Sequence, residues 1–210
     1  MPSTWYKSIG GQSVSKEVTP NSGEKDIKRG VPFRIEYPLA KSHACVQLMG
    51  HAFILRCMEQ LLETKDFIPT WDSLVFKMEG EGVPIRWHRD ASAESVGFDT
   101  PAIDVGFYLD DANEELGNCL WAVPGSQKWP DFLAGQLGLH LTKDGFNRNG
   151  SVPIPVKPGD VILHNILVLH GSSSSSSPLR RTVYYEYRSI PHELKYGPHQ
   201  PKYIPPKQRT

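Results

Sequence analysis

The stretch Pro84-Ile85-Arg86-Trp87-His88-Arg89-Asp90 places an imidazole and a carboxylate two residues apart, after apolar and aromatic residues. In an extended chain, residues two apart point to the same side. His88 and Asp90 can therefore bind one ion together, while Arg89 points away. A second histidine would complete the facial triad of two histidines and one carboxylate that suits Fe(II) in oxygenases. Because a His-x-Asp tripeptide often occurs by chance, the hypothesis depends on the rest of the chain.

Short strands and turns surround this stretch. After Pro69 apolar residues recur with period two, and a turn at 79–82 predicts a hairpin whose return strand carries His88 and Asp90. Eighteen prolines and eighteen glycines fit a turn-rich β architecture better than a helical bundle. We therefore expect a mainly β (α+β) fold, an antiparallel double-stranded β-helix of the jelly-roll, cupin-like kind. The predicted strands cover 73–78, 85–90, 102–109, 119–123, 152–156, 161–164, 167–170 and 181–189, with a short helix and a loop within 129–151.

Ahead of these strands, apolar residues recur at helical spacing and predict one helix at about 43–66, packed outside the sheet. Residues 1–30 are polar and without a period, so we interpret them as a flexible lead-in. The tail 191–210 is rich in proline and is expected to be irregular. A chain of 210 residues fits one domain of ordinary size, which we place at 31–190.

Composition limits the cellular setting and the partners. The formal net charge is zero, so a surface that follows nucleic-acid phosphates is not expected. We expect no signal peptide and no membrane span, since no apolar run approaches 18 residues. Three widely spaced cysteines fit reduced thiols, and hence a cytoplasmic protein. No pattern indicates an oligomeric state.

A second constellation follows about eighty residues later. His170 ends an apolar run before a Gly-Ser loop, and Arg180 and Arg181 come ten residues after it. A jelly roll brings distant strands together, so His170 can face His88 and Asp90 with an arginine deeper in the cavity. A guanidinium binds a carboxylate through two hydrogen bonds. A dicarboxylate such as 2-oxoglutarate could therefore chelate iron at one end and meet the arginine at the other.

His164 is the rival for the third ligand position. It lies six residues before His170 and directly before Asn165, within an apolar segment. This placement favours a packed strand residue over a ligand.

The ordered set of these motifs resembles the phytanoyl-CoA dioxygenase family. The resemblance runs from about Leu74 to Ser189, and its motifs are specific as an ordered set. They are His88-x-Asp90, Gly117-Asn118-Cys119-Leu120-Trp121-Ala122-Val123-Pro124-Gly125-Ser126-Gln127-Lys128, Pro158-Gly159-Asp160-Val161, Leu169-His170-Gly171-Ser172 and Arg180-Arg181.

The resemblance implies an Fe(II)- and 2-oxoglutarate-dependent dioxygenase that uses O2 and releases succinate and CO2. It implies His88, Asp90 and His170 as catalytic iron ligands, and an arginine after the distal histidine as the anchor of the co-substrate. The carboxylate at Asp90 argues against the halogenating branch of the family, which carries a small residue there.

Either of two arginines could be this anchor. Counting forward from His170 favours Arg181, whereas aligning the strand favours Arg180, and we choose Arg180 because strand register fixes side-chain direction. Thr182 would then share its face and help to hold the same carboxylate. Lys77 occupies a position that is often polar near the co-substrate, although a solvated lysine is the simpler interpretation.

The expected reaction is hydroxylation of a small-molecule substrate, with desaturation or other oxidation as variants. The alternative is a jelly-roll protein that binds a metal or small molecule without turnover. No sequence motif indicates which substrate is used.

Overall fold

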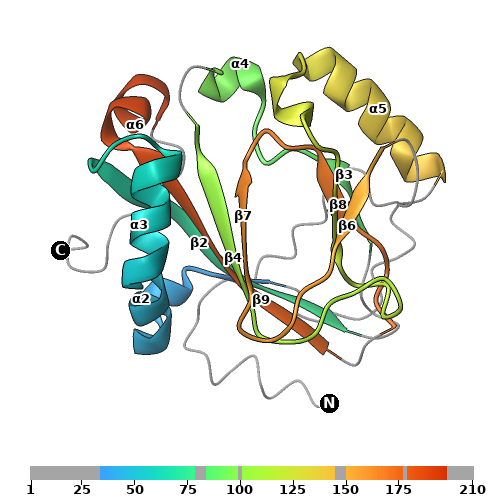
Figure 1. The fold of residues 1–210 in the computed structure, drawn as a ribbon, viewed down its shortest axis with the longest axis horizontal. Coiled ribbons are helices and arrows are strands. Elements are labelled where there is room, and N and C mark those ends of the chain that lie inside the picture. Colours follow the sequence, from blue (N-terminus) through green and yellow to red (C-terminus); the bar gives the residue numbers. More distant parts are fainter. Residues whose placement is uncertain (1–33, 79–83, 99–100, 145–149, 177–178, 198–210) are drawn as a thin grey trace.

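The computed structural model describes residues 34–78, 84–98, 101–144, 150–176 and 179–197. Within these ranges two sheets face each other, with helices outside them (Figure 1). The five-stranded sheet has the order β1-β2-β9-β4-β7 and the four-stranded sheet the order β3-β8-β5-β6. All neighbours in both sheets are antiparallel. The expected double-stranded β-helix is confirmed.

The strands of the two sheets alternate along much of the chain, so segments distant in sequence become neighbours. The strands are β1 (Arg34–Glu36), β2 (Phe67–Met78), β3 (Ile85–His88), β4 (Ile103–Tyr108), β5 (Leu120–Ala122), β6 (Val152–Ile154), β7 (Val161–Asn165), β8 (His170–Ser172) and β9 (Leu179–Ser189). The helices are η1 (Pro38–Ala40), α2 (His43–Met49), α3 (Ala52–Leu61), α4 (Ala93–Val96), η2 (Ser126–Lys128), α5 (Asp131–Asp144) and α6 (Ile190–Tyr196).

The five-stranded sheet is buried on both faces. Alternate residues of β9, namely Val183, Tyr185 and Tyr187, belong to a core shared with Ile54 and Met58 of α3. The hydroxyls of Tyr185 and Tyr187 donate hydrogen bonds to the carbonyls of Cys45 and Met49 in α2, at 2.7 and 2.8 Å. These bonds attach the leading helices to the outer face and leave the other face of β9 for the interior.

The prediction of a single helix at about 43–66 is wrong in its extent. Two helices, α2 and α3, replace it, and the chain leaves the helical conformation at Gly50 and His51. His51 has an extended backbone (φ −63°, ψ 119°). Glycine has poor helix propensity, and apolar periodicity alone does not reveal such a break.

The predicted hairpin of 73–78 and 85–90 is also wrong, because β2 pairs with β1 and β9 whereas β3 pairs with β8. The segments 161–164 and 167–170 do not form a pair of strands. Instead β7 joins the five-stranded sheet and β8 the four-stranded sheet. The physical reason is that a jelly roll sends successive strands to opposite sheets, which local turn signals do not reveal.

The expectation of an irregular tail at 191–210 is wrong for its first residues, since α6 covers Ile190–Tyr196. Ser189 caps this helix by accepting a hydrogen bond from the backbone N–H of His192, and Pro191 fits the first turn. The lead-in expected at 1–30 and the segment 198–210 lie outside the described residues. Among the described helices, none has the length and apolar character needed to cross a membrane.

Met58→Ala should destabilise the fold by about 2–5 kcal/mol, because the Met58 side chain is completely buried between α3 and the sheet. Urea unfolding measures this loss. Leu61→Ala on the same helix is the control, since Leu61 is 42% exposed and should cost much less. Equal losses for the two variants would contradict the described packing of α3.

Candidate active site

Three side chains from two neighbouring strands meet at one point of the interior. His88 ends β3, Asp90 lies two residues beyond, and His170 begins β8 as the register partner of His88. The Nε2 atoms of both histidines lie 3.7 Å from Oδ1 of Asp90. The three potential ligand atoms all lie within 4.8 Å of one another. The structure thus brings together the three residues that the sequence singled out.

Backbone carbonyls orient both imidazoles. Nδ1 of His88 donates to the carbonyl of Arg86 at 2.7 Å, and Nδ1 of His170 donates to that of Val168 at 2.9 Å. A carbonyl oxygen only accepts, so the proton of each neutral ring lies on Nδ1. Each Nε2 therefore presents its lone pair toward Asp90, the arrangement in which histidine binds a metal.

The electrostatics favour metal binding. Burial lowers the pKa of His170 to about 3, so its imidazole is neutral at pH 7. Desolvation acts to raise the pKa of Asp90, but the nearby imidazoles of His170, His164 and His88 hold it below its ordinary value. A neutral imidazole at His170 and an ionised carboxylate at Asp90 belong to the donor set that iron(II) accepts in facial sites.

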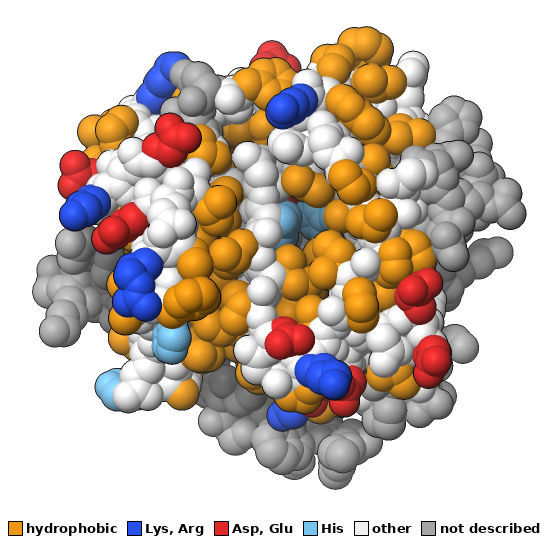
Figure 2. All heavy atoms as spheres, in the orientation of Figure 1, with side chains coloured by type: hydrophobic (Ala, Val, Ile, Leu, Met, Phe, Trp, Pro, Cys, Tyr) orange, Lys and Arg blue, Asp and Glu red, His pale blue; other side chains and the backbone are white. Residues whose placement is uncertain are grey.

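The site is open on one side. The side chain of His170 is 8% exposed, whereas those of Asp90 and His88 are 27% and 41% exposed. Figure 2 shows histidine side chains at the bottom of a hollow surrounded by hydrophobic side chains. Within the trio, the side chains of His88 and Asp90 are therefore more open to a ligand than that of His170.

A third histidine contacts the trio. His164 of β7 was expected to be a packed strand residue, and its side chain is indeed only 9% exposed. Its Nε2, however, lies 3.2 Å from Oδ2 of Asp90, the oxygen that does not face His88 and His170.

Sequence reasoning missed Asp104, which lies beside His164. Asp104 of β4 is the register partner of His164, is 6% exposed and has no hydrogen-bond partner for its Oδ1 among the described residues. The pKa of Asp104 is raised to about 8, mainly by burial; the charge of His164 opposes this rise, whereas the carboxylates of Asp90 and Glu186 contribute to it. The sequence feature that could have pointed to Asp104 is a single acidic residue in a strand that is otherwise apolar.

The two candidate arginines point in opposite directions. Arg180 is 1% exposed, lies on the interior face of β9 and donates a hydrogen bond to the carbonyl of Asn118. The side chain of Arg181 is 42% exposed and bonds both oxygens of Asp110, at 2.9 and 2.7 Å. The side chain of Arg181 therefore lies at the surface, whereas that of Arg180 lies in the interior.

Lys77 and Thr182 accompany Arg180 inside. Lys77 of β2 is the register partner of Arg180 and is 3% exposed, with its ammonium bonded to the carbonyls of Ser172 and Ser173. Thr182 is fully buried, and its hydroxyl has no hydrogen-bond partner among the described residues. The expectation of a solvated Lys77 is wrong, because the lysine lies on the interior face of β2.

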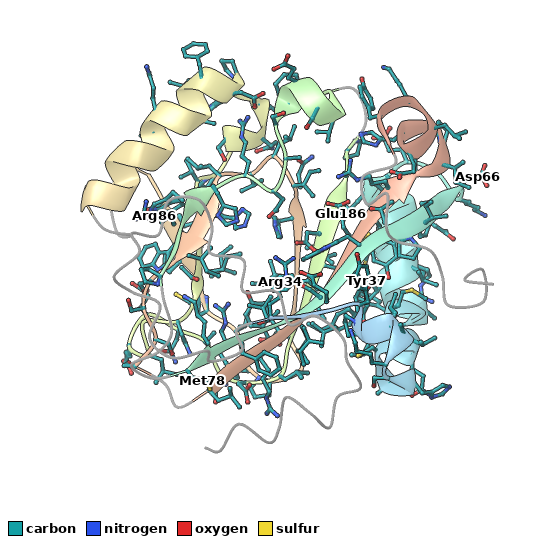
Figure 3. The ribbon with its side chains drawn as sticks, turned by 180° about the vertical axis from the view of Figure 1, so that it is seen from behind. Arg34, Tyr37, Asp66, Met78, Arg86 and Glu186 are labelled. Carbon is teal, nitrogen blue, oxygen red and sulfur yellow. The ribbon has the colours of Figure 1, made fainter. Side chains whose placement is uncertain are left out.

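Further along the same face of β9 lies a second polar group. Oε1 of Glu186 accepts hydrogen bonds from Arg188 Nε and from the Thr70 hydroxyl, both at 2.6 Å. In the view from behind, Glu186 faces the interior between the sheets and Arg86 lies on the opposite sheet (Figure 3). Buried polar groups thus occur near both ends of β9, with Arg180 near its start and Glu186 near its end.

Four aromatic residues on these strands divide between the two cores. Trp87, Tyr108 and Trp121 are buried between the sheets. Phe107 is buried on the other face, under the helices.

Fold and site together define a double-stranded β-helix in which two histidines and one carboxylate converge as in a facial metal site. The family model described as phytanoyl-CoA dioxygenase (PhyH) matches residues 8–183. The chain belongs to this family.

A curated protein also resembles this chain in sequence. The Danio rerio protein "Phytanoyl-CoA dioxygenase domain-containing protein 1" is 31% identical over 124 residues, which cover 52% of this chain and 40% of the relative. The chain thus spans less than half the length of that curated relative.

Solved structures show the same fold. AviO1 from Streptomyces viridochromogenes Tue57 is 28% identical with a TM-score of 0.63, and the match covers 78% of this chain and 69% of AviO1. EctD from S. alaskensis, solved with 2-oxoglutarate and 5-hydroxyectoine, is 23% identical with a TM-score of 0.62, and the match covers 76% and 57% of the two chains.

Stability should rise with pH through the state of Lys77. Burial, followed by the charge of Arg180, lowers its pKa from 10.5 to about 6. Between these values the unfolded chain holds a proton that the folded chain lacks, so raising the pH favours folding. This contribution amounts to at most about 1.4 kcal/mol per pH unit.

Urea unfolding at pH 7, 8 and 9 tests this expectation. Lys77→Met should flatten the pH dependence relative to wild type, because it removes the titrating group. Lys128→Met is the control, since an exposed lysine is solvated in both states. If the curves of wild type and Lys77→Met are parallel, Lys77 does not have the lowered pKa.

Proposed function

We propose that this protein is an Fe(II)- and 2-oxoglutarate-dependent dioxygenase that hydroxylates a small-molecule substrate. The overall reaction converts a substrate C–H, O2 and 2-oxoglutarate into C–OH, succinate and CO2. The observation that carries the proposal is the combination of a facial trio on the four-stranded sheet with the buried side chains of Arg180 and Lys77 on the opposite sheet. Residues 31–190 would form the oxygenase domain.

His88, Asp90 and His170 would hold the iron. Their two Nε2 atoms and Oδ1 converge, and both Nδ1 atoms already bond to backbone carbonyls, so the rings need no reorientation. Bound there, iron would supply the activation of O2 and the oxidative decarboxylation of the co-substrate.

Arg180, Thr182 and Lys77 would hold the distal carboxylate of 2-oxoglutarate. Nε of Arg180 and the Thr182 hydroxyl are buried donors without hydrogen-bond partners among the described residues, which suits a polar ligand. An anion bound beside Arg180 and Lys77 would offset the repulsion between these two side chains, which helps to lower the pKa of Lys77. Charged and hydroxyl donors on one buried face suit a carboxylate.

The remaining side of the site would receive the substrate. His88 and Asp90 are the exposed members of the trio, and the hydrophobic surroundings of the hollow would exclude water from the reacting centre.

A cytoplasmic location is supported by the three cysteines, all free in the structure. EctD, solved with bound Fe and with 2-oxoglutarate, supports the same use of the fold.

His170→Ala should abolish succinate formation by protein supplied with Fe(II), ascorbate, O2 and 2-oxoglutarate, because it removes a buried metal ligand. Formation of succinate is measured with a panel of small molecules and without added substrate. His43→Ala is the control, since His43 is exposed on α2 and far in sequence from the trio. Wild-type protein that binds 2-oxoglutarate but never decarboxylates it would favour a binding protein.

Arg180→Met should raise the KM for 2-oxoglutarate by roughly 10- to 100-fold, the cost of a buried charged hydrogen bond. Arg181→Met is the matched control, because the adjacent arginine faces outward and pairs with Asp110. Initial rates of succinate formation at varied 2-oxoglutarate give both constants. A larger effect of Arg181→Met would refute the assignment of Arg180.

A further inference from the structure

The two oxygens of the Asp90 carboxylate have different neighbours. Oδ1 lies 3.7 Å from the Nε2 atoms of both His88 and His170. Oδ2 lies 3.2 Å from Nε2 of His164, which comes from the opposite sheet. One carboxylate therefore connects the two sheets, with one oxygen toward the trio and the other toward β7.

The contact between His164 and Asp90 is a hydrogen bond in which Nε2 of His164 donates. An ionised carboxylate only accepts hydrogen bonds, so the proton must lie on the imidazole. The ring packs against His170 with a centroid separation of 4.8 Å and an interplanar angle of 64°. Packing against His170 and the position on β7 both restrict the movement of His164.

We propose that His164 is a positioning residue that keeps Oδ2 of Asp90 away from the metal, so that Asp90 binds through Oδ1 alone. This inference rests on the proposed function. Carboxylates bind metals through one or both oxygens, and a freely rotating Asp90 could use both. The second oxygen would then occupy a coordination position that a chelating 2-oxoglutarate or O2 needs.

The surroundings of His164 make this role specific. Its cross-strand neighbour Asp104 is buried, and its carboxyl lies within 4.8 Å of ligand atoms of both His164 and Asp90. The next carboxylate along this row, Glu186, is the register partner of Asp104 and is already bonded by Arg188 and Thr70. Among the described side chains, the hydrogen bond to Oδ2 of Asp90 comes from His164.

The test compares His164→Leu, which removes the donor, with His164→Gln, whose amide N–H can replace Nε2–H. Under anaerobic conditions, Fe(II) and 2-oxoglutarate are added, and the visible charge-transfer absorption of a chelated 2-oxoacid is titrated together with bound metal per chain. We expect 2-oxoglutarate to bind roughly 10- to 100-fold more weakly in His164→Leu, the usual effect of losing an outer hydrogen bond at a metal site. His164→Gln should remain within a few-fold of wild type.

Two outcomes would overturn the proposal. The first is an affinity of the metal-loaded protein for 2-oxoglutarate that is unchanged in His164→Leu, even if the variant is less stable, because a structural role alone predicts this result. The second is two metals per chain in wild type and one in His164→Gln, which would make His164 a ligand with Asp90 and Asp104.

The proposed function is tested separately by the same titration. If wild-type protein shows no charge-transfer absorption with Fe(II) and 2-oxoglutarate, the proposed function fails. If wild type shows it and His164→Leu matches wild type, the dioxygenase assignment stands and only the role of His164 is refuted.

Discussion

The two-sided character of strand β9 is the constraint on which the rest of the structure depends. Its odd-numbered residues Val183, Tyr185 and Tyr187 pack under the helices. Its even-numbered residues, including Arg180 and Glu186, face the interior. Because side chains alternate along a strand, one segment contributes both to the hydrophobic core that stabilises the sheet and to the polar lining of the cavity. A register shift by one residue would exchange these faces and abolish both.

Burial of polar groups in this interior is tolerated because most of them have partners. Glu186 is bonded by Arg188 and Thr70, and the imidazoles of His88 and His170 are bonded by backbone carbonyls. Among the described residues, Asp104 Oδ1, Arg180 Nε and Thr182 Oγ1 are three of the buried polar atoms without a hydrogen-bond partner, and all three belong to the interior face of the five-stranded sheet. Unsatisfied buried polar atoms cost free energy, so a polar ligand that bonded to these three atoms would gain by satisfying them.

Much of the fold was predictable because strand periodicity and turn residues are local signals. The strands over 102–109 and 181–189 were found for this reason, and the pairing of His88 with Asp90 because the two residues are close in sequence. The break between α2 and α3, the helix α6 and the partners of β2 were missed. Each of these depends on a cap or on pairing with a distant strand. Asp104 was missed because one polar residue in an apolar strand gives no hint of its neighbours.

The sequence by itself determined the class of fold, the family resemblance and the candidate ligands, because these depend on residue type, order and alternation. Only the tertiary structure decided that Arg180 faces inward while Arg181 pairs with Asp110. It alone showed that His164 contacts the second oxygen of Asp90. The physical reason is that strand pairing across two sheets sets these distances, and pairing between segments distant in sequence is fixed by packing of the whole domain.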